Sequence, residues 1–246
     1  MPFAAFGPGT VYVQRTDIAN ATPVNIGYAN EFSVDESATT KQLYGENQYP
    51  LVTARGTVKT TGKLKAAMIS ATALDIYHGQ GLTTGQLLVA VREAGTIPAS
   101  TTYTVTVANS ATFDTDLGVV YASNNLPFAK VASGPTIGQY SVSAGVYTFA
   151  AADASVVVGI SYASTATGGQ KKTVTNKKIG TTPTFQLDYA TSLNGNPYVV
   201  RLFQCIASKL TQQFKLEDFM MPELDFEYFA NAAGQVYEVS YPPAAG

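Results

Sequence analysis

The chain has 246 residues, a net charge of −2 and a pI of about 5.4, values that argue against a general nucleic-acid-binding protein. Charged residues make up only 13% of it, and 15 tyrosines and 12 phenylalanines occur without tryptophan, which is more typical of a β-rich assembly protein than of a soluble enzyme. Cys205 is the only cysteine, so an intrachain disulfide and a cysteine-based metal site are excluded, and its apolar surroundings predict a small buried side chain.

No apolar run approaches the ~20 residues that a membrane helix needs. The first positive charge is Arg15, so we expect no secretory signal and folding in a cytoplasm. At this length the chain buries enough surface to fold without staples. It could form one large all-β domain or two small ones, and we expect a single domain over 1–246.

The first 36 residues predict an arm and a strand. Met1–Thr10 (MPFAAFGPGT) is apolar and rich in Gly and Pro, which indicates an extended N-terminal arm. Its Phe3 and Phe6 would be exposed unless a partner covered them, so we expect them to make the arm's contacts. From Val24 to Glu36 apolar and polar residues alternate, as in a half-buried strand with one wet face.

Ser37–Pro50 (SATTKQLYGENQYP) is a long polar segment that carries Leu43, Tyr44 and Tyr49. It is longer than a usual hairpin loop, and loops of that length are often functional. Two interpretations stay open: an ordinary mobile surface loop, or an interface in which the three large side chains are anchors within a wet rim.

One helix is predicted, within Thr60–Gly79 and over about 61–78. Its apolar stripe is Leu64, Ala67, Met68, Ala71 and Leu74, at helical spacing. Thr60 or Thr61 can cap its start, and Gly79 can end it in the left-handed conformation. His78, the one histidine, falls in the last turn, where an imidazolium would favour the helix dipole.

After the helix the sequence again reads as short strands. Ser143–Gly145 is the clearest hairpin turn, and Asn231–Gly234 is predicted to close a second hairpin between the last two strands. Ser164–Gly180 carries four lysines and is interpreted as a solvated loop or a protected edge strand. The fold class is therefore mainly β, a β-sandwich or bent antiparallel sheets with one flanking helix.

No catalytic set is recognisable. No HExxH, Walker, GxGxxG or GxSxG pattern occurs, and one histidine would have to serve any triad. Acidic residues cluster near 217–227, but such acids more often form a solvated strand face than a glycosidase pair. We expect no enzyme, no cofactor and no metal site.

Three segments carry a resemblance to a known family. The run from Asn30 to Leu64, with its LYG and its ARG and GK pieces, resembles the strand, long loop, strand and helix unit of phage tail tube proteins. Asn109–Tyr162 resembles a segment recurrent in virion proteins of tailed phages, and the stretch from TPTFQLDY to GQVYEV resembles the closing strands of the tube family.

The resemblance implies hexameric rings whose inner sheets join into a continuous β-barrel. Rings then stack into a hollow tail tube through which DNA passes without specific binding. The implied partners are a tape measure, a baseplate or tip, a terminator, and a sheath if the tail has one. The implied location is the virion tail, with assembly in the host cytoplasm and no membrane. Within this scheme 37–50 is the inter-ring loop, and 96–163 is either a peripheral β elaboration or part of the core sandwich.

Strand alternation places Glu31, Asp35, Glu223, Asp225 and Glu227 on faces opposite the core residues. These acids either face bulk solvent on the outside or line the tube. The resemblance favours the lumen, where sixfold copying would make rings of carboxylates that repel DNA phosphates. The alternative for the whole chain is a non-catalytic β-sandwich adhesion or carbohydrate-binding module of a phage or bacterial surface structure, which would also explain the tyrosine content.

Overall fold

The computed structural model describes residues 8–67, 71–193, 196–214, 216–217 and 219–241. Strands account for 59% of the chain and helical residues for 5%, so the prediction of a mainly β protein with antiparallel sheets is confirmed. The chain divides into two compact units, where the sequence predicted one domain. Unit 1 comprises Met1–Leu82 and Lys172–Gly246, and unit 2 comprises Thr83–Lys171. Each has its own hydrophobic core.

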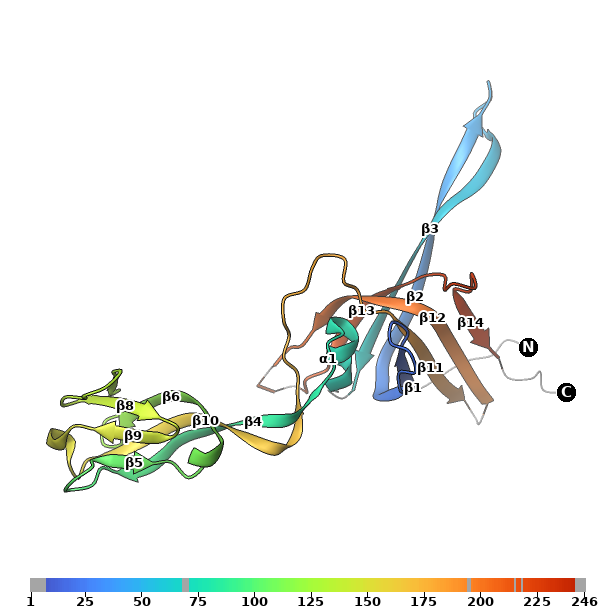
Figure 1. The fold of residues 1–246 in the computed structure, drawn as a ribbon. Helices are drawn as coiled ribbons and strands as arrows, with labels where there is room; N and C mark the ends of the chain where they lie inside the picture. The colour runs from blue at the N-terminus through green and yellow to red at the C-terminus, as the bar shows by residue number, and fades with distance from the viewer. Residues whose placement is uncertain (1–7, 68–70, 194–195, 215, 218, 242–246) are drawn as a thin grey trace. The chain divides into compact units, whose positions relative to one another are not determined.

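Unit 1 is built on a sheet of seven strands and one helix (Figure 1). Its elements are β1 (Gly9–Arg15), β2 (Val24–Tyr44), β3 (Pro50–Ala66), α1 (Ala71–His78), β11 (Phe185–Leu193), β12 (Asn196–Thr211), β13 (Glu223–Tyr228) and β14 (Tyr237–Ser240). The strand order is β11-β1-β2-β3-β13-β12-β14, and β11 also pairs with β12. The six strands other than β14 therefore form a closed ring of antiparallel pairings.

The core of unit 1 lies inside this ring and follows from strand alternation. Val11 and Val13 from β1, Leu187 from β11, and Leu224 and Phe226 from β13 are all buried. Cys205 on β12 is fully buried in the same core, as its apolar surroundings predict. Helix α1 lies against β12 and β2, and its Ile76 completes the core.

The predicted helix over Thr60–Gly79 is wrong in its first half. Residues 60–66 continue β3, where Leu64 and Ala66 are buried and Lys63 points to the other face. The run TGKLKA satisfies a period of two as well as helical spacing, and β2 and β13 pair with β3 on its two sides here, which decides the matter. Met68 lies outside the described residues.

The predicted end of the helix is confirmed. Helix α1 stops at His78, and Gly79 has φ +64° and donates its N–H to the Asp75 carbonyl. The charged His78 expected there is not favoured, because burial and then the positive charge of Lys172 lower the pKa of its imidazole.

Unit 2 is a two-sheet sandwich inserted between α1 and β11. Its strands are β4 (Thr83–Thr96), β5 (Thr104–Thr106), β6 (Phe113–Tyr121), β7 (Ala129–Lys130), β8 (Gln139–Ser143), β9 (Val146–Phe149) and β10 (Val157–Lys171). One sheet has the order β4-β10-β6 and the other β5-β9-β8-β7. Side chains from both sheets form one core, and residues 96–163 lie wholly within this unit.

Two predicted turns have different outcomes. Ser143 pairs with Val146, so Ala144 and Gly145, both at positive φ, make the predicted two-residue hairpin turn. The predicted closing hairpin is wrong in its strand pairing, although its turn forms and the Gly234 N–H donates to the Asn231 carbonyl. Strands β13 and β14 do not pair with each other; both pair with β12, one after the other along its length.

Candidate assembly surface

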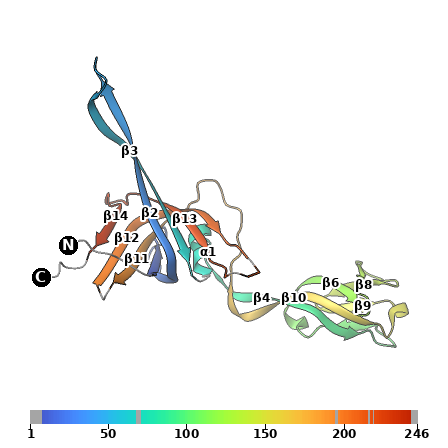
Figure 2. The ribbon, with the colours of Figure 1, turned by 180° about the vertical axis from the view of Figure 1, so that it is seen from behind.

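The most exposed element of unit 1 is the far part of the β2–β3 hairpin. The two strands pair from Ala29 opposite Ala66 to Tyr44 opposite Pro50. Strand β1 pairs with β2 only as far as Ala29, and β13 with β3 only from Gly62 to Lys65. Residues 35–59, here called the arm, are therefore a two-stranded ribbon that projects from the ring in both views (Figure 1, Figure 2), and all of them except Pro50 are exposed.

The arm replaces the predicted loop over Ser37–Pro50. Residues 37–44 belong to β2, and only 45–49 form a turn. A strand was missed because neither of its faces is buried, so the sequence shows no apolar alternation here.

The tip of the arm gathers large apolar side chains that nothing in unit 1 covers. The predicted interface residues Leu43, Tyr44 and Tyr49 are exposed, with Tyr49 at 81%. Leu51 and Val52, which pair across from that region, are exposed as well. Sequence reasoning missed these two because it placed them in an ordinary strand, although two adjacent apolar residues beside Leu43 and Tyr44 were the available signal.

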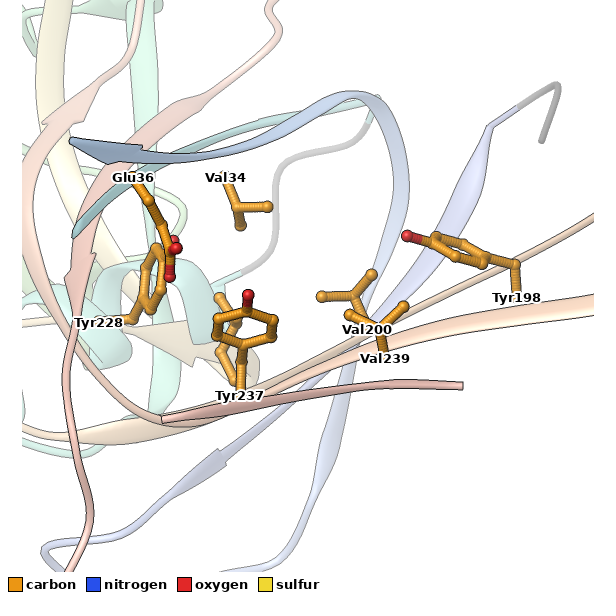
Figure 3. Close-up of a pocket in the computed structure, with 8 residues that line it drawn as sticks. Val34, Glu36, Tyr198, Val200, Tyr228, Tyr237 and Val239 are labelled. Atoms are coloured by element: carbon orange, nitrogen blue, oxygen red, sulfur yellow. The ribbon is translucent and has the colours of Figure 1, made fainter. Parts of the chain in front are cut away.

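At the base of the arm two adjoining cavities, of about 300 and 590 Å³, open between β2, β3, β13 and β14; together they are called the groove. They share Glu36, Tyr228 and Tyr237. In the smaller cavity, Val34 faces Val200 and Val239 across the opening, and Glu36 lies beside Tyr228 (Figure 3). Burial, and then the charge of Glu36, raises the pKa of Tyr228 to about 12, so its hydroxyl stays protonated.

The five predicted acids lie on the side of β2 and β13 away from the core. In β13 the acids alternate with the buried Leu224, Phe226 and Tyr228, as predicted. The acids themselves are Glu31, Asp35, Glu223, Asp225 and Glu227, all of them exposed or half-buried.

Lysines on neighbouring strands share that face. Lys63 Nζ lies 2.5 Å from Glu223 Oε1, and Lys209 Nζ lies 3.8 Å from Asp225 Oδ2. Lys65 is in register with both Glu31 and Glu223. The hydrogen bond from Lys63 holds the pKa of Glu223 below its usual value. The face is therefore mixed in charge, a feature that sequence reasoning missed because it assigned Lys63 and Lys65 to a helix.

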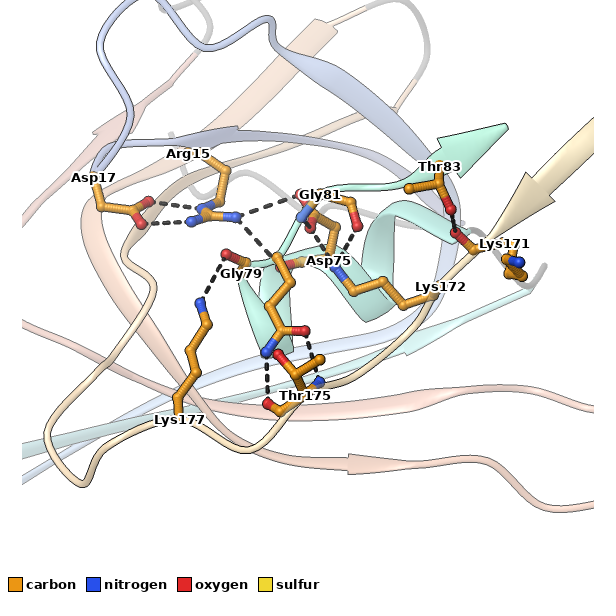
Figure 4. A network of polar contacts seen from close by, with 11 residues as sticks. Arg15, Asp17, Asp75, Gly79, Gly81, Thr83, Lys171, Lys172, Thr175 and Lys177 are labelled. Atoms are coloured by element: carbon orange, nitrogen blue, oxygen red, sulfur yellow. Dashed lines mark hydrogen bonds and ion pairs between the residues drawn. The ribbon is translucent and has the colours of Figure 1, made fainter. Parts of the chain in front are cut away.

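The basic run at Ser164–Gly180 has a structural role in unit 1 (Figure 4). Lys172 Nζ lies 2.6 Å from Asp75 Oδ1 and donates to the Gly81 carbonyl at 2.8 Å, with its side chain only 4% exposed. Burial opposes the charge of Asp75, but hydrogen bonds from Lys172 and the Gly81 N–H outweigh it and lower the pKa of that carboxyl.

Further contacts tie the same two segments together. Gln80 exchanges two hydrogen bonds with the backbone of Thr175, and Lys177 donates to the Gly79 carbonyl. Arg15 bonds to Asp75 as well. The chain leaving α1 and the chain returning at Lys172 are therefore fixed side by side within unit 1, so an 89-residue unit is inserted there without loosening the ring.

A buried carboxylate, that of Asp116, is the centre of a hydrogen-bond network in unit 2. Asp116, with 5% of its side chain exposed, accepts hydrogen bonds from Tyr140 at 2.7 Å, Tyr147 at 3.0 Å and the Gly118 N–H, and pairs with Lys130. Burial opposes ionisation, but these partners lower the pKa of Asp116. The carboxylate in turn raises the pKa of both tyrosines, after burial. This is a closed structural network with no group presented to a ligand.

Phe3 and Phe6 lie outside the described residues. Where the chain is described, no group of three or more His, Cys, Asp and Glu could hold a metal ion. Neither does any described helix combine the length and apolar character needed to cross a membrane. In comparisons with known proteins, no family model matches the chain and no curated protein is significantly similar to it.

Proposed function

We propose that the protein is a virion structural protein of the phage tail tube type, whose hexameric rings stack into the hollow tube that conducts DNA into the host. The arm carries this proposal. A two-stranded hairpin without further support is marginally stable in water, and large exposed apolar side chains gathered at its tip are typical of a surface that another subunit covers. The resemblance of Asn30–Leu64 to tube proteins spans this same arm.

Sixfold rings, the other tail proteins as partners and the location in the virion tail rest on that resemblance. The topology of unit 1 adds one constraint. Because six strands already pair in a closed ring, the sheet of unit 1 can join that of another copy only through an open edge, such as that of β14 or of the arm.

The mixed face is proposed to line the lumen. Its five acids exceed Lys63, Lys65 and Lys209 in number, so sixfold copying still leaves the bore net negative. Pairing with lysines reduces the repulsion that bare rings of carboxylates would suffer, and it leaves a weaker negative surface along which phosphates slide.

The alternative is a carbohydrate-binding or adhesive sandwich, and the two-sheet sandwich of this chain is unit 2. Glycan sites rely on exposed aromatic platforms, but all eight tyrosines and phenylalanines of 83–171 are buried or packed against the core. That observation favours assembly over glycan binding.

Light scattering and negative-stain microscopy across a concentration series test the proposal. We expect hollow tubes of stacked rings above a critical concentration. A protein that stays monomeric at every salt and protein concentration, or that binds glycans as a small oligomer, would contradict it.

A further inference from the structure

We infer that the groove of one subunit is the receptor for the arm tip of the next subunit, with Tyr49 seated in the cavity lined by Val34, Glu36, Val200, Tyr237 and Val239. The inference rests on the proposed function and deepens it, because it names the surface that receives the arm. The occupant is a second copy of this chain.

The chemistry of the two surfaces matches. The cavity walls are valine, leucine and tyrosine, which suit an aromatic ring, and the carboxylate of Glu36 at its edge can accept a hydrogen bond from a phenol. Tyr49 is the most exposed aromatic residue of the arm. The larger adjoining cavity, lined by Val58, Phe229 and Val236, offers apolar surface for the other tip residues, Leu43 and Leu51.

Charges are complementary as well. The tip carries one acid, Glu46, and the larger cavity of the groove carries one base, Arg55. Within the described part of the chain, neither of them takes part in an ion pair. The charge of Glu46 on one copy can therefore be paired with that of Arg55 on the next.

The arm cannot fill its own groove. Tyr44 lies eight positions beyond Glu36 along β2, a span of roughly 26 Å at about 3.3 Å per residue. The ladder between β2 and β3 continues to Tyr44 and Pro50, so folding the tip back would break it. The occupant must come from another molecule.

Because tip and groove are different surfaces, the contact is heterologous. A heterologous contact repeats from one copy to the next and produces either a closed ring or an open polymer, and the proposed stacking uses the open form. Each added subunit buries one tip and presents a fresh one, as axial stacking requires.

Mixing two variants tests this directly. The first replaces 43–51 by a short Gly/Asn turn and has a groove but no tip. The second is Val239→Trp, with Val34→Trp filling the cavity from the opposite wall as an independent version, and has a tip but no groove. Val157→Trp, at an exposed position of unit 2, is the matched control. Circular dichroism establishes that each is folded.

We expect each variant alone to raise the critical concentration for tubes by at least roughly tenfold, as loss of a hot spot does. When the two variants are mixed, the tip of one should bind the groove of the other. Growth should then stop after two layers, because no further tip and groove are left to pair. Two outcomes would overturn the inference and leave the proposed function intact. One is normal tube growth of the wild type and of both tryptophan variants, and the other is long tubes from the mixture. Absence of tubes from the wild type would instead overturn the proposed function.

A disulfide test does not depend on the tryptophan variants. In Tyr49→Cys/Val239→Cys we expect oxidation to link chains in tubes and not in monomers, while the buried Cys205 stays unreactive. If Phe3→Cys becomes linked to Val239→Cys and Tyr49→Cys does not, the groove binds the N-terminal segment Met1–Thr10 and the inference is overturned.

Discussion

The two units place their aromatic residues in opposite ways. In unit 2 every tyrosine and phenylalanine is in or against the core, and the buried hydroxyls of Tyr140, Tyr147 and Tyr162 bond to carboxylates. In unit 1 many aromatic residues are exposed: Tyr12, Tyr28, Tyr44, Tyr49, Phe214, Phe219, Phe229, Tyr237 and Tyr241.

The difference indicates two roles. Unit 2 packs all of its aromatic rings in or against its own core, and what it leaves exposed is aliphatic, such as Leu87, Val91 and Ile137. Unit 1 closes its strand ring around a core but leaves aromatic surface on the arm and around the groove, which is the pattern of a subunit completed by its neighbours. Substitutions in each unit test whether assembly depends on unit 1 and stability on the core of unit 2.

The largest effect is expected from the arm. Replacing residues 43–51 by a short Gly/Asn turn should abolish tube growth, because the proposed stacking contact is lost, while circular dichroism stays unchanged. Replacing an exposed segment of unit 2, such as 133–137, by a linker of equal length is the control and should leave growth normal. Tubes that grow at the normal rate without the tip would show that the arm is not the stacking element.

A pair of tyrosine substitutions should separate the units. Tyr147→Ala removes a fully buried ring from unit 2 and should lower its free energy of unfolding by about 3–5 kcal/mol. Tyr49→Ala should leave stability unchanged and weaken assembly. Thermal unfolding and the critical concentration, measured on both proteins, are the two readouts, and a reversed pattern would contradict the comparison.

The Asp116 network predicts that the stability of unit 2 depends on pH. The pKa of Asp116 is lower in the folded state than its ordinary value, so its contribution to stability is complete above about pH 4 and is lost as the pH falls through the folded pKa. Asp116→Asn should cost about 1–3 kcal/mol at neutral pH and flatten this acid dependence. Urea unfolding from pH 7 to 2 measures both, and an unchanged pH profile would show that another group is responsible.

The smallest effect is expected at the mixed face. Lys63 and Glu223 form a solvent-accessible, half-buried pair, so Lys63→Ala should leave the unfolding curve of unit 1 unchanged within error. If the face lines the bore, the variant should alter DNA passage by making the lumen more acidic. Fluorescent oligonucleotide retained in assembled tubes at low salt is the measure, with Lys178→Ala as the charge-matched control. Equal retention by both variants would place the face elsewhere.

Much of the local structure could be predicted from the sequence. Alternation in 223–228 identified the buried and the polar face of β13, and Gly79 and the Ala144–Gly145 pair marked a helix end and a hairpin turn. These predictions succeeded because they depend on neighbouring residues only, through the pleat of a strand and the cost of positive φ.

Other features depended on partners distant in sequence. Residues 60–66 fit a helix or a strand by pattern, and pairing with β2 and β13 decided for the strand. The arm is a strand with two wet faces, which no periodicity marks, and β14 pairs with β12 where a local hairpin looked sufficient. The groove joins residues more than 190 positions apart, such as Val34 and Val239.

The sequence by itself thus determined the class of the fold, the turns and which side of a strand is polar, because composition and short-range sterics set these. Only the tertiary structure decided that the chain has two cores, that Lys63 and Lys65 stand among the acids, and that Lys172 is buried against Asp75. Those outcomes depend on which strands pair and in which register, and register places charges and apolar side chains opposite partners that no local pattern specifies.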